Sequence, residues 1–125
     1  NYISEKLILK DLKLNGIDLI CLAGFMKILS KDFIKKFNGK ILNIHPSLLP
    51  KYKGLNTHKR VIKNKEKYSG CTVHFVNSKL DAGKIILQKK VKISKRDTPE
   101  SLKIKVLKQE HKLYPKALTK ILTNL

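Results

Sequence analysis

An asparagine and a histidine stand two positions apart in the run Asn43-Ile44-His45-Pro46, at the end of an apolar stretch. Alternate side chains of an extended strand share a face, so Asn43 and His45 point to the same side. An amide N–H group and an imidazole aimed at one point can polarise a carbonyl group and handle a proton. A histidine at a strand end beside a proline loop is also a common structural hydrogen-bonding group. The pattern alone therefore leaves a catalytic and a structural interpretation open.

The polar segment 77–83 carries one carboxylate, that of Asp81, in front of Ala-Gly. This sequence is a frequent turn former, and taken alone the segment favours that structural role. If the fold brings Asp81 beside His45, the carboxylate favours the protonated, acid form of the imidazole. We predict that Asn43, His45 and Asp81 converge on one cleft at the carboxyl edge of the sheet. Leu49-Pro50 is a candidate for a cis peptide bond, because the proline-bounded loop must return toward this site.

The other histidines and the two cysteines are expected to be structural. His74 lies in a strand-like run, His58 lies beside the proline loop, and His111 lies in a helical segment. Three scattered histidines without acidic partners make a poor metal site, so no metal is expected. Cys21 and Cys71 each lie in an apolar run and are expected to be buried, reduced thiols.

The formal net charge is +19, which raises the question of a nucleic-acid partner. Only Arg60 and Arg96 are arginines among the 28 basic residues, whereas phosphate and base-edge recognition favours the arginine fork. The lysines are spread from Lys6 to Lys120, which favours a solvated surface that attracts small anions. No apolar run approaches the roughly 18 residues of a membrane helix. We therefore expect a cytoplasmic protein with small-molecule partners, no nucleic acid and no membrane.

Hydrophobic periodicity and turn residues predict an α/β fold in one domain, residues 1–125. The expected elements are helix 3–14, strand 17–23, helix 30–37, strand 40–44, helix 57–65, strand 70–76, strand 85–93 and a last helix that begins at Thr98-Pro99. Strand 17–23 is almost continuously apolar, which predicts burial on both faces of a parallel sheet. We expect a mainly parallel sheet flanked by helices, and we expect Pro115 to break or restart the last helix.

Five segments, in order along the chain, resemble the glycinamide ribonucleotide formyltransferase family. They are residues 22–30, 43–50, 54–58, 80–83 with 86–88, and 109–111 with Tyr114-Pro115. The resemblance covers essentially all 125 residues. It implies a Rossmann-like formyltransferase fold and transfer of a formyl group from 10-formyltetrahydrofolate to the amine of glycinamide ribonucleotide, a step of purine biosynthesis.

The resemblance also implies roles for individual residues. Its catalytic trio corresponds to Asn43, His45 and Asp81. Its folate pocket corresponds to Met26, Lys27, Ile28, Leu29, Asn43, Asn77, Ser78, Lys79, Leu80 and Asp81. Its ribonucleotide contacts correspond to Pro46, Leu107, Lys108, Gln109 and Glu110, with Glu110 facing the amino end. Lys27 stands where the family often has arginine.

The family places a first strand and a Gly-rich phosphate-binding turn ahead of the region that matches Asn1. We therefore expect the N-terminal part of the fold to be missing here, and the 125 residues alone to bind folate weakly and turn over negligibly. Two related folate enzymes, methionyl-tRNA formyltransferase and formyltetrahydrofolate deformylase, remain alternatives, as does a non-enzymatic basic RNA-binding module. The sequence does not set the oligomeric state.

Overall fold

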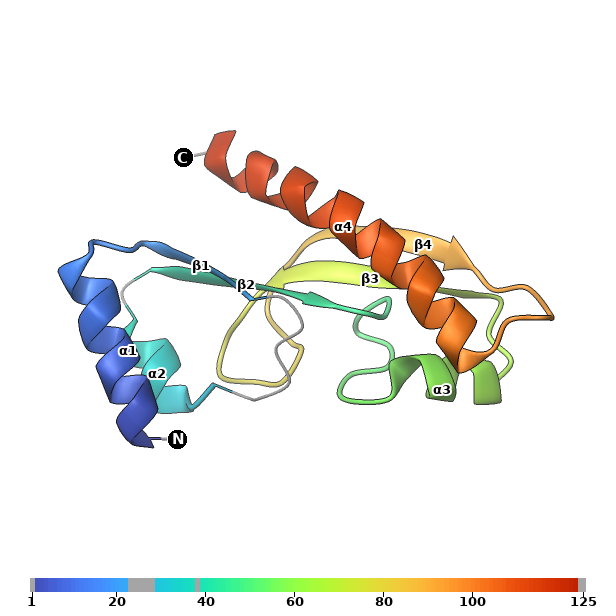
Figure 1. The fold of residues 1–125 in the computed structure, drawn as a ribbon, viewed down its shortest axis with the longest axis horizontal. Coiled ribbons are helices and arrows are strands. Elements are labelled where there is room, and N and C mark those ends of the chain that lie inside the picture. Colours follow the sequence, from blue (N-terminus) through green and yellow to red (C-terminus); the bar gives the residue numbers. More distant parts are fainter. Residues whose placement is uncertain (1, 23–28, 38, 124–125) are drawn as a thin grey trace.

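The computed structural model describes residues 2–22, 29–37 and 39–123, which form a four-stranded sheet with helices packed on it (Figure 1). Every element lies close to where the sequence predicted it, with ends that differ by a few residues. In chain order they are α1 (Tyr2–Leu14), β1 (Leu19–Leu22), α2 (Lys31–Lys36), β2 (Lys40–His45), α3 (Thr57–Lys63), β3 (Tyr68–Phe75), β4 (Ile85–Lys92) and α4 (Pro99–Thr123).

Local capping explains where the helices begin and end. After α1, Gly16 adopts φ 62°, a left-handed conformation that glycine takes without a Cβ penalty, and the helix ends there. The hydroxyl of Ser30 accepts the backbone N–H of Phe33 at 3.0 Å and caps the N-terminus of α2. Thr98 and Ser101 bond reciprocally, side chain to backbone, at the start of α4.

The sheet has the order β1-β2-β3-β4 and mixed strand directions. β1 pairs with β2 in parallel, whereas β2 with β3 and β3 with β4 pair antiparallel. The α/β class is confirmed, but the expectation of a mainly parallel sheet is wrong for these strands. The connection between β3 and β4 is short and contains no crossover helix, and such a connection joins antiparallel neighbours.

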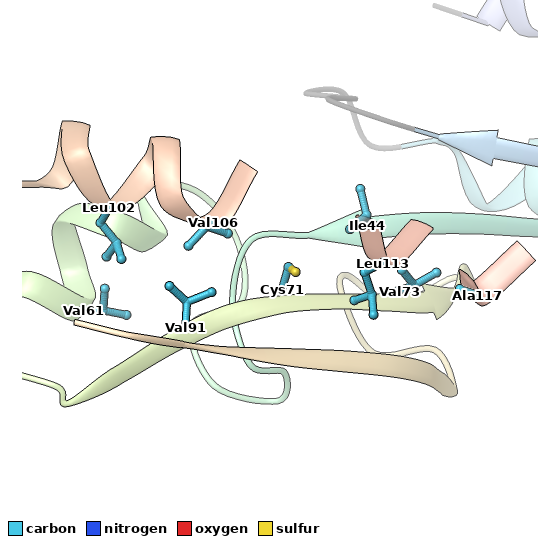
Figure 2. Packing of buried hydrophobic residues seen from close by; sticks show 9 residues of the cluster. All are labelled: Ile44, Val61, Cys71, Val73, Val91, Leu102, Val106, Leu113 and Ala117. Carbon is cyan, nitrogen blue, oxygen red and sulfur yellow. The ribbon is translucent and has the colours of Figure 1, made fainter. Parts of the chain in front are cut away.

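Two hydrophobic cores hold the layers together. On one face, α4 packs against β3 and β4, and α3 packs against α4. Figure 2 shows the side chains that meet there: Ile44, Val61, Cys71, Val73, Val91, Leu102, Val106, Leu113 and Ala117. A smaller cluster around Phe33, Phe37 and Ile41 packs under α1 and α2. Ile41 and Ile44 have opposite parity on β2, so the two cores lie on opposite faces of the sheet.

Strand β1 is less buried than predicted. Leu19, Ile20 and Leu22 are half-buried, and Cys21 is exposed. The exposed side chain of Cys21 leaves one face of β1 open, so the prediction of burial on both faces was wrong. Within the described residues β1 pairs only with β2. The expectation of a buried thiol is correct for Cys71 and wrong for Cys21.

Helix α4 continues through Pro115, contrary to the expected break. A proline inside a helix costs about 3 kcal/mol, because it removes one N–H and crowds the preceding turn. Leu113, Ala117 and Ile121 are buried on either side of Pro115. Burial of each large apolar side chain contributes about 1.5–3 kcal/mol, which offsets the cost of the proline.

Two further features bear on the expectations. Leu49-Pro50 is a cis peptide bond, as predicted. None of the helices in the described ranges has the length and apolar character needed to cross a membrane.

Candidate active site

Asn43 and His45 lie at the C-terminal end of β2, on the face of the sheet that also carries Ile41. Leu22, the last residue of β1, is in register with Asn43. Asn43 and His45 therefore lie at the carboxyl end of the parallel pair formed by β1 and β2. His45 is buried and Asn43 is half-buried. The predicted position at the carboxyl edge is confirmed for these two residues.

Asp81 reaches His45 from the loop between β3 and β4. Its Oδ2 lies 3.5 Å from Nδ1 of His45, and the two side chains are each 8% exposed. The same oxygen accepts the backbone N–H of Gly54 at 2.8 Å. Asp81 has φ 47°, in the left-handed region, so the turn chemistry of the loop aims the carboxylate at β2. The sequence prediction that Asp81 meets His45 is confirmed.

Both ring nitrogens of His45 face acceptors. Nε2 donates to the carbonyl oxygen of Tyr52 at 2.8 Å, and Nδ1 faces Asp81. An imidazolium carries a proton on each nitrogen and satisfies both acceptors at once. The arrangement can therefore hold a positive charge at the carboxyl end of β2.

His74 is a third titratable group of the same site, which the sequence assigned to a structural role only. It lies opposite Asn43 across β2 and β3, and its Nδ1 donates to the carbonyl of Phe75 at 2.9 Å. Its buried Nε2 lies 4.0 Å from Oδ1 of Asp81 and has no hydrogen-bond partner among the described residues. Burial lowers the pKa of His74, and its hydrogen bond to Phe75 and the charge of Asp81 oppose that shift.

The sequence did not predict His74 as a site residue, because it did not show that β2 and β3 pair antiparallel. In an antiparallel pair, residues directly opposite each other share a face. His74 is opposite Asn43, and Thr72 is opposite His45. Once the strand directions are known, His74 follows from the position of Asn43.

Asn43 carries an unused polar atom. Its Oδ1 is buried and lacks a hydrogen-bond partner within the described part of the chain. Buried polar atoms are nearly always paired, and exceptions often mark a place for a water or a ligand group. Asn43 is therefore poised to bind a group that enters beside His45 and Asp81.

A network of polar groups holds the proline loop that follows β2. The hydroxyl of Thr72 donates to the carbonyl of Ser47 at 2.7 Å and accepts the N–H of Leu49 at 3.1 Å. The side-chain amide of Gln88 donates to the carbonyl of Leu49 at 2.8 Å, and Ser47 donates to the carbonyl of Lys51 at 2.6 Å. The network fixes the loop whose Tyr52 carbonyl orients His45.

His58 lies on α3 near the same loop and is half-buried. Burial lowers the pKa of His58, and the positive charges of Lys103 and His45 lower it further. Its Nδ1 is buried without a hydrogen-bond partner among the described residues. This is an environment for a neutral imidazole.

Besides Asn43 and Asp81, the predicted folate residues lie in two segments, 26–29 and 77–80. Met26, Lys27 and Ile28 lie outside the described residues. Leu29 packs against the smaller core. The second segment is the exposed loop before Asp81, formed by Asn77, Ser78, Lys79 and Leu80. In this loop the backbone N–H of Lys79 donates to the side chain of Asn77 at 2.9 Å.

The predicted ribonucleotide residues lie on α4, except for half-buried Pro46. Leu107 and Lys108 are exposed, and Gln109 and Glu110 are half-buried. Burial raises the pKa of Glu110. Burial and, next, the charge of Glu110 raise the pKa of Cys71 to about 12. Its contact with the amino end of a substrate stays a prediction.

Comparisons with known proteins identify the family of this chain. The family model described as formyl transferase matches residues 3–118. The chain therefore belongs to the formyl transferase family.

The relatives and solved structures have consistent names. The chain is 54% identical over 100 residues to the phosphoribosylglycinamide formyltransferase of Haemophilus influenzae, covering 80% of this chain and 47% of that protein. It is 53% identical over 103 residues to the human trifunctional purine biosynthetic protein adenosine-3, covering 82% of this chain and 10% of that protein. The crystal structure of phosphoribosylglycinamide formyltransferase from Anaplasma phagocytophilum superposes with a TM-score of 0.91 at 45% identity, covering 95% of this chain and 57% of that one.

The α/β, Rossmann-like fold class expected from the sequence is thus confirmed. This chain spans about half the length of the bacterial relative and about a tenth of the human one.

Proposed function

We propose that this chain carries the catalytic residues of a phosphoribosylglycinamide formyltransferase. The enzyme would transfer the formyl group of 10-formyltetrahydrofolate to the amine of glycinamide ribonucleotide. The observation that supports this most is the buried pair of His45 and Asp81 beside Asn43, at the carboxyl end of β2. In the same proposal residues 1–125 form one formyltransferase domain, which acts on small molecules in the cytoplasm and binds neither nucleic acid nor membrane.

The first chemical step is attack of the neutral substrate amine on the formyl carbon. A carbon–nitrogen bond forms, and the carbonyl oxygen becomes an oxyanion. The amide N–H of Asn43 donates to this oxygen, and the imidazolium of His45 supplies positive charge to it. Asp81 positions the ring and stabilises its charge, because its carboxylate faces Nδ1 in a nearly water-free setting.

In the second step the bond between the formyl carbon and N10 of the folate breaks. The attacking nitrogen loses a proton and N10 gains one, so the products are the formylated amine and tetrahydrofolate. Nδ1 of His74 donates to Phe75, so in the neutral ring Nε2 is an unfilled acceptor close to Asp81. We assign to Asp81 and His74 the binding of the water through which this proton moves.

Binding of the co-substrate is supported by exposure and by unpaired atoms. Loop residues Asn77 to Leu80 are exposed next to Asp81, where they can contact the folate ring system. The unpaired Oδ1 of Asn43 suits the polar groups of such a ligand. Glu110, as a half-buried carboxylate, is proposed to contact the substrate amine, and the other α4 positions and Pro46 to line its path.

The test is an assay of Asn43→Ala in a chimera that joins residues 1–125 to the part of the Haemophilus influenzae relative that this chain does not match. Product is measured by mass spectrometry as formylated glycinamide ribonucleotide. Loss of one oxyanion donor lowers turnover by about 10²–10³-fold. The matched control is Asn15→Ala, which changes an exposed asparagine next to α1 and should leave turnover unchanged.

Three results would contradict the proposal. Full turnover by Asn43→Ala would remove Asn43 from the chemistry. Formylation of methionyl-tRNA in place of glycinamide ribonucleotide would change the substrate. Release of free formate without an acceptor would indicate a deformylase.

A further inference from the structure

A cavity of about 450 Å³ lies away from His45 and Asp81, between the end of α3 and the strands β3 and β4. Its size falls within the range of small-molecule binding pockets, roughly 300–1,000 Å³. Nothing in the formyl-transfer reaction uses it. The lining residues that matter here are Lys51, Lys65, Lys67, Lys90, Tyr68 and Ser69.

The charge of the lining is strongly positive. Four lysines line the cavity, and the single carboxylate, Glu66, lies 3.6 Å from the ammonium group of Lys51. Lys65 and Lys67 have no ion-pair partner among the residues that the structure describes, and the ammonium of Lys90 lies over the ring of Tyr68 at 5.1 Å from its centre. Lysine ammonium groups bind phosphate as point charges. The cavity therefore has three cations available to an anion.

We propose that this cavity is a second binding site, which takes a small organic phosphate: a phosphate monoester carrying a ring. The lysines bind the phosphate. The volume is larger than inorganic phosphate needs, and the rings of Tyr52 and Tyr68 offer a surface to the organic part. This inference does not depend on the proposed formyl transfer.

The site is also joined to the candidate active site through one segment of backbone. Lys51 and Tyr52 form part of the cavity wall, and the carbonyl of Tyr52 accepts the hydrogen bond from His45 at 2.8 Å. A ligand that shifts this segment would change the surroundings of His45. The His45 signals therefore serve as a second reporter of binding.

The experiment titrates the ¹⁵N-labelled 125-residue chain with adenosine 5′-monophosphate and follows amide shifts by NMR. Saturable shifts are expected at Ser69, Lys67 and Tyr52. Lys65→Gln with Lys67→Gln should weaken binding by about tenfold or more for each lysine that contacts the phosphate.

The control pair is Lys95→Gln with Lys116→Gln, which removes the same charge from exposed positions outside the cavity. The control pair should change the affinity for adenosine 5′-monophosphate by no more than about twofold, because distant exposed charges are largely screened. Equal weakening by the two pairs would overturn the site, since it would show general attraction to a basic surface. Shifts that do not saturate would overturn it as well. Equal affinity for inorganic phosphate and for adenosine 5′-monophosphate would overturn the assignment to an organic phosphate.

Discussion

Replacement of Asp81 by asparagine tests the pairing on which the candidate site depends. Oδ2 of Asp81 lies 3.5 Å from Nδ1 of His45 and 2.8 Å from the N–H of Gly54. At an effective dielectric constant of about 20, the gross attraction of the ion pair is about 5 kcal/mol. Desolvation of the two nearly buried side chains offsets most of this attraction. We expect Asp81→Asn to lower the free energy of unfolding by about 1–3 kcal/mol.

The assay is a double-mutant cycle by urea denaturation at pH 6, with Asp81→Asn, His45→Gln and the double variant. A direct pair has a coupling free energy of about 0.5–3 kcal/mol, whereas independent sites add to within about 0.3–0.5 kcal/mol. Asp18→Asn changes an exposed carboxylate and should alter stability by less than about 0.5 kcal/mol. Additive effects of the Asp81 and His45 changes would refute the pairing, and with it the role of Asp81 in stabilising the imidazolium.

Other consequences concern the elements that position the site. Tyr114→Phe removes a hydroxyl that lies 2.6 and 3.2 Å from carbonyl oxygens of β1 and β2, so the free energy of unfolding should fall by about 1 kcal/mol. Urea denaturation should show a lower midpoint and an unchanged dependence of free energy on urea concentration. An unchanged midpoint would contradict this prediction. Hydrogen bonding, first of all with Lys105, lowers the pKa of Asp97 from 3.8 to about 2, so its contribution to stability is present above pH 3.8 and is lost as pH falls through about 2. Asp97→Asn should therefore be less stable than the parent chain at pH 5, and the gap should close near pH 2; a constant gap would argue against the charged interaction. In Gly83→Ala the new methyl group would overlap the carbonyl oxygen of Phe75, so the free energy of unfolding should fall by about 1–3 kcal/mol and the coupling of Asp81 with His45 should weaken. An unchanged free energy of unfolding would refute the clash.

Much of the site was predictable because it depends on short-range geometry. Strand alternation placed Asn43 and His45 on one face, and this holds whatever the neighbours of β2 are. The end of a parallel strand pair is where α/β proteins bind ligands, so the location followed from the order of the elements. Asp81 was harder, because a carboxylate in a turn has a structural explanation of its own. The resemblance to a family, read across five segments, connected it with His45.

The sequence by itself also determined the helix ends and the strand positions. Caps at Ser30 and Gly16 act within four residues of the backbone groups that they satisfy, so they can be read without the fold. The tertiary structure alone decided strand direction, and with it the placement of His74 beside Asn43 and Asp81. It also decided that α4 runs through Pro115, because burial of Leu113 and Ile121 outweighs a local penalty. These outcomes depend on contacts between distant segments, and no local pattern records which segments will meet.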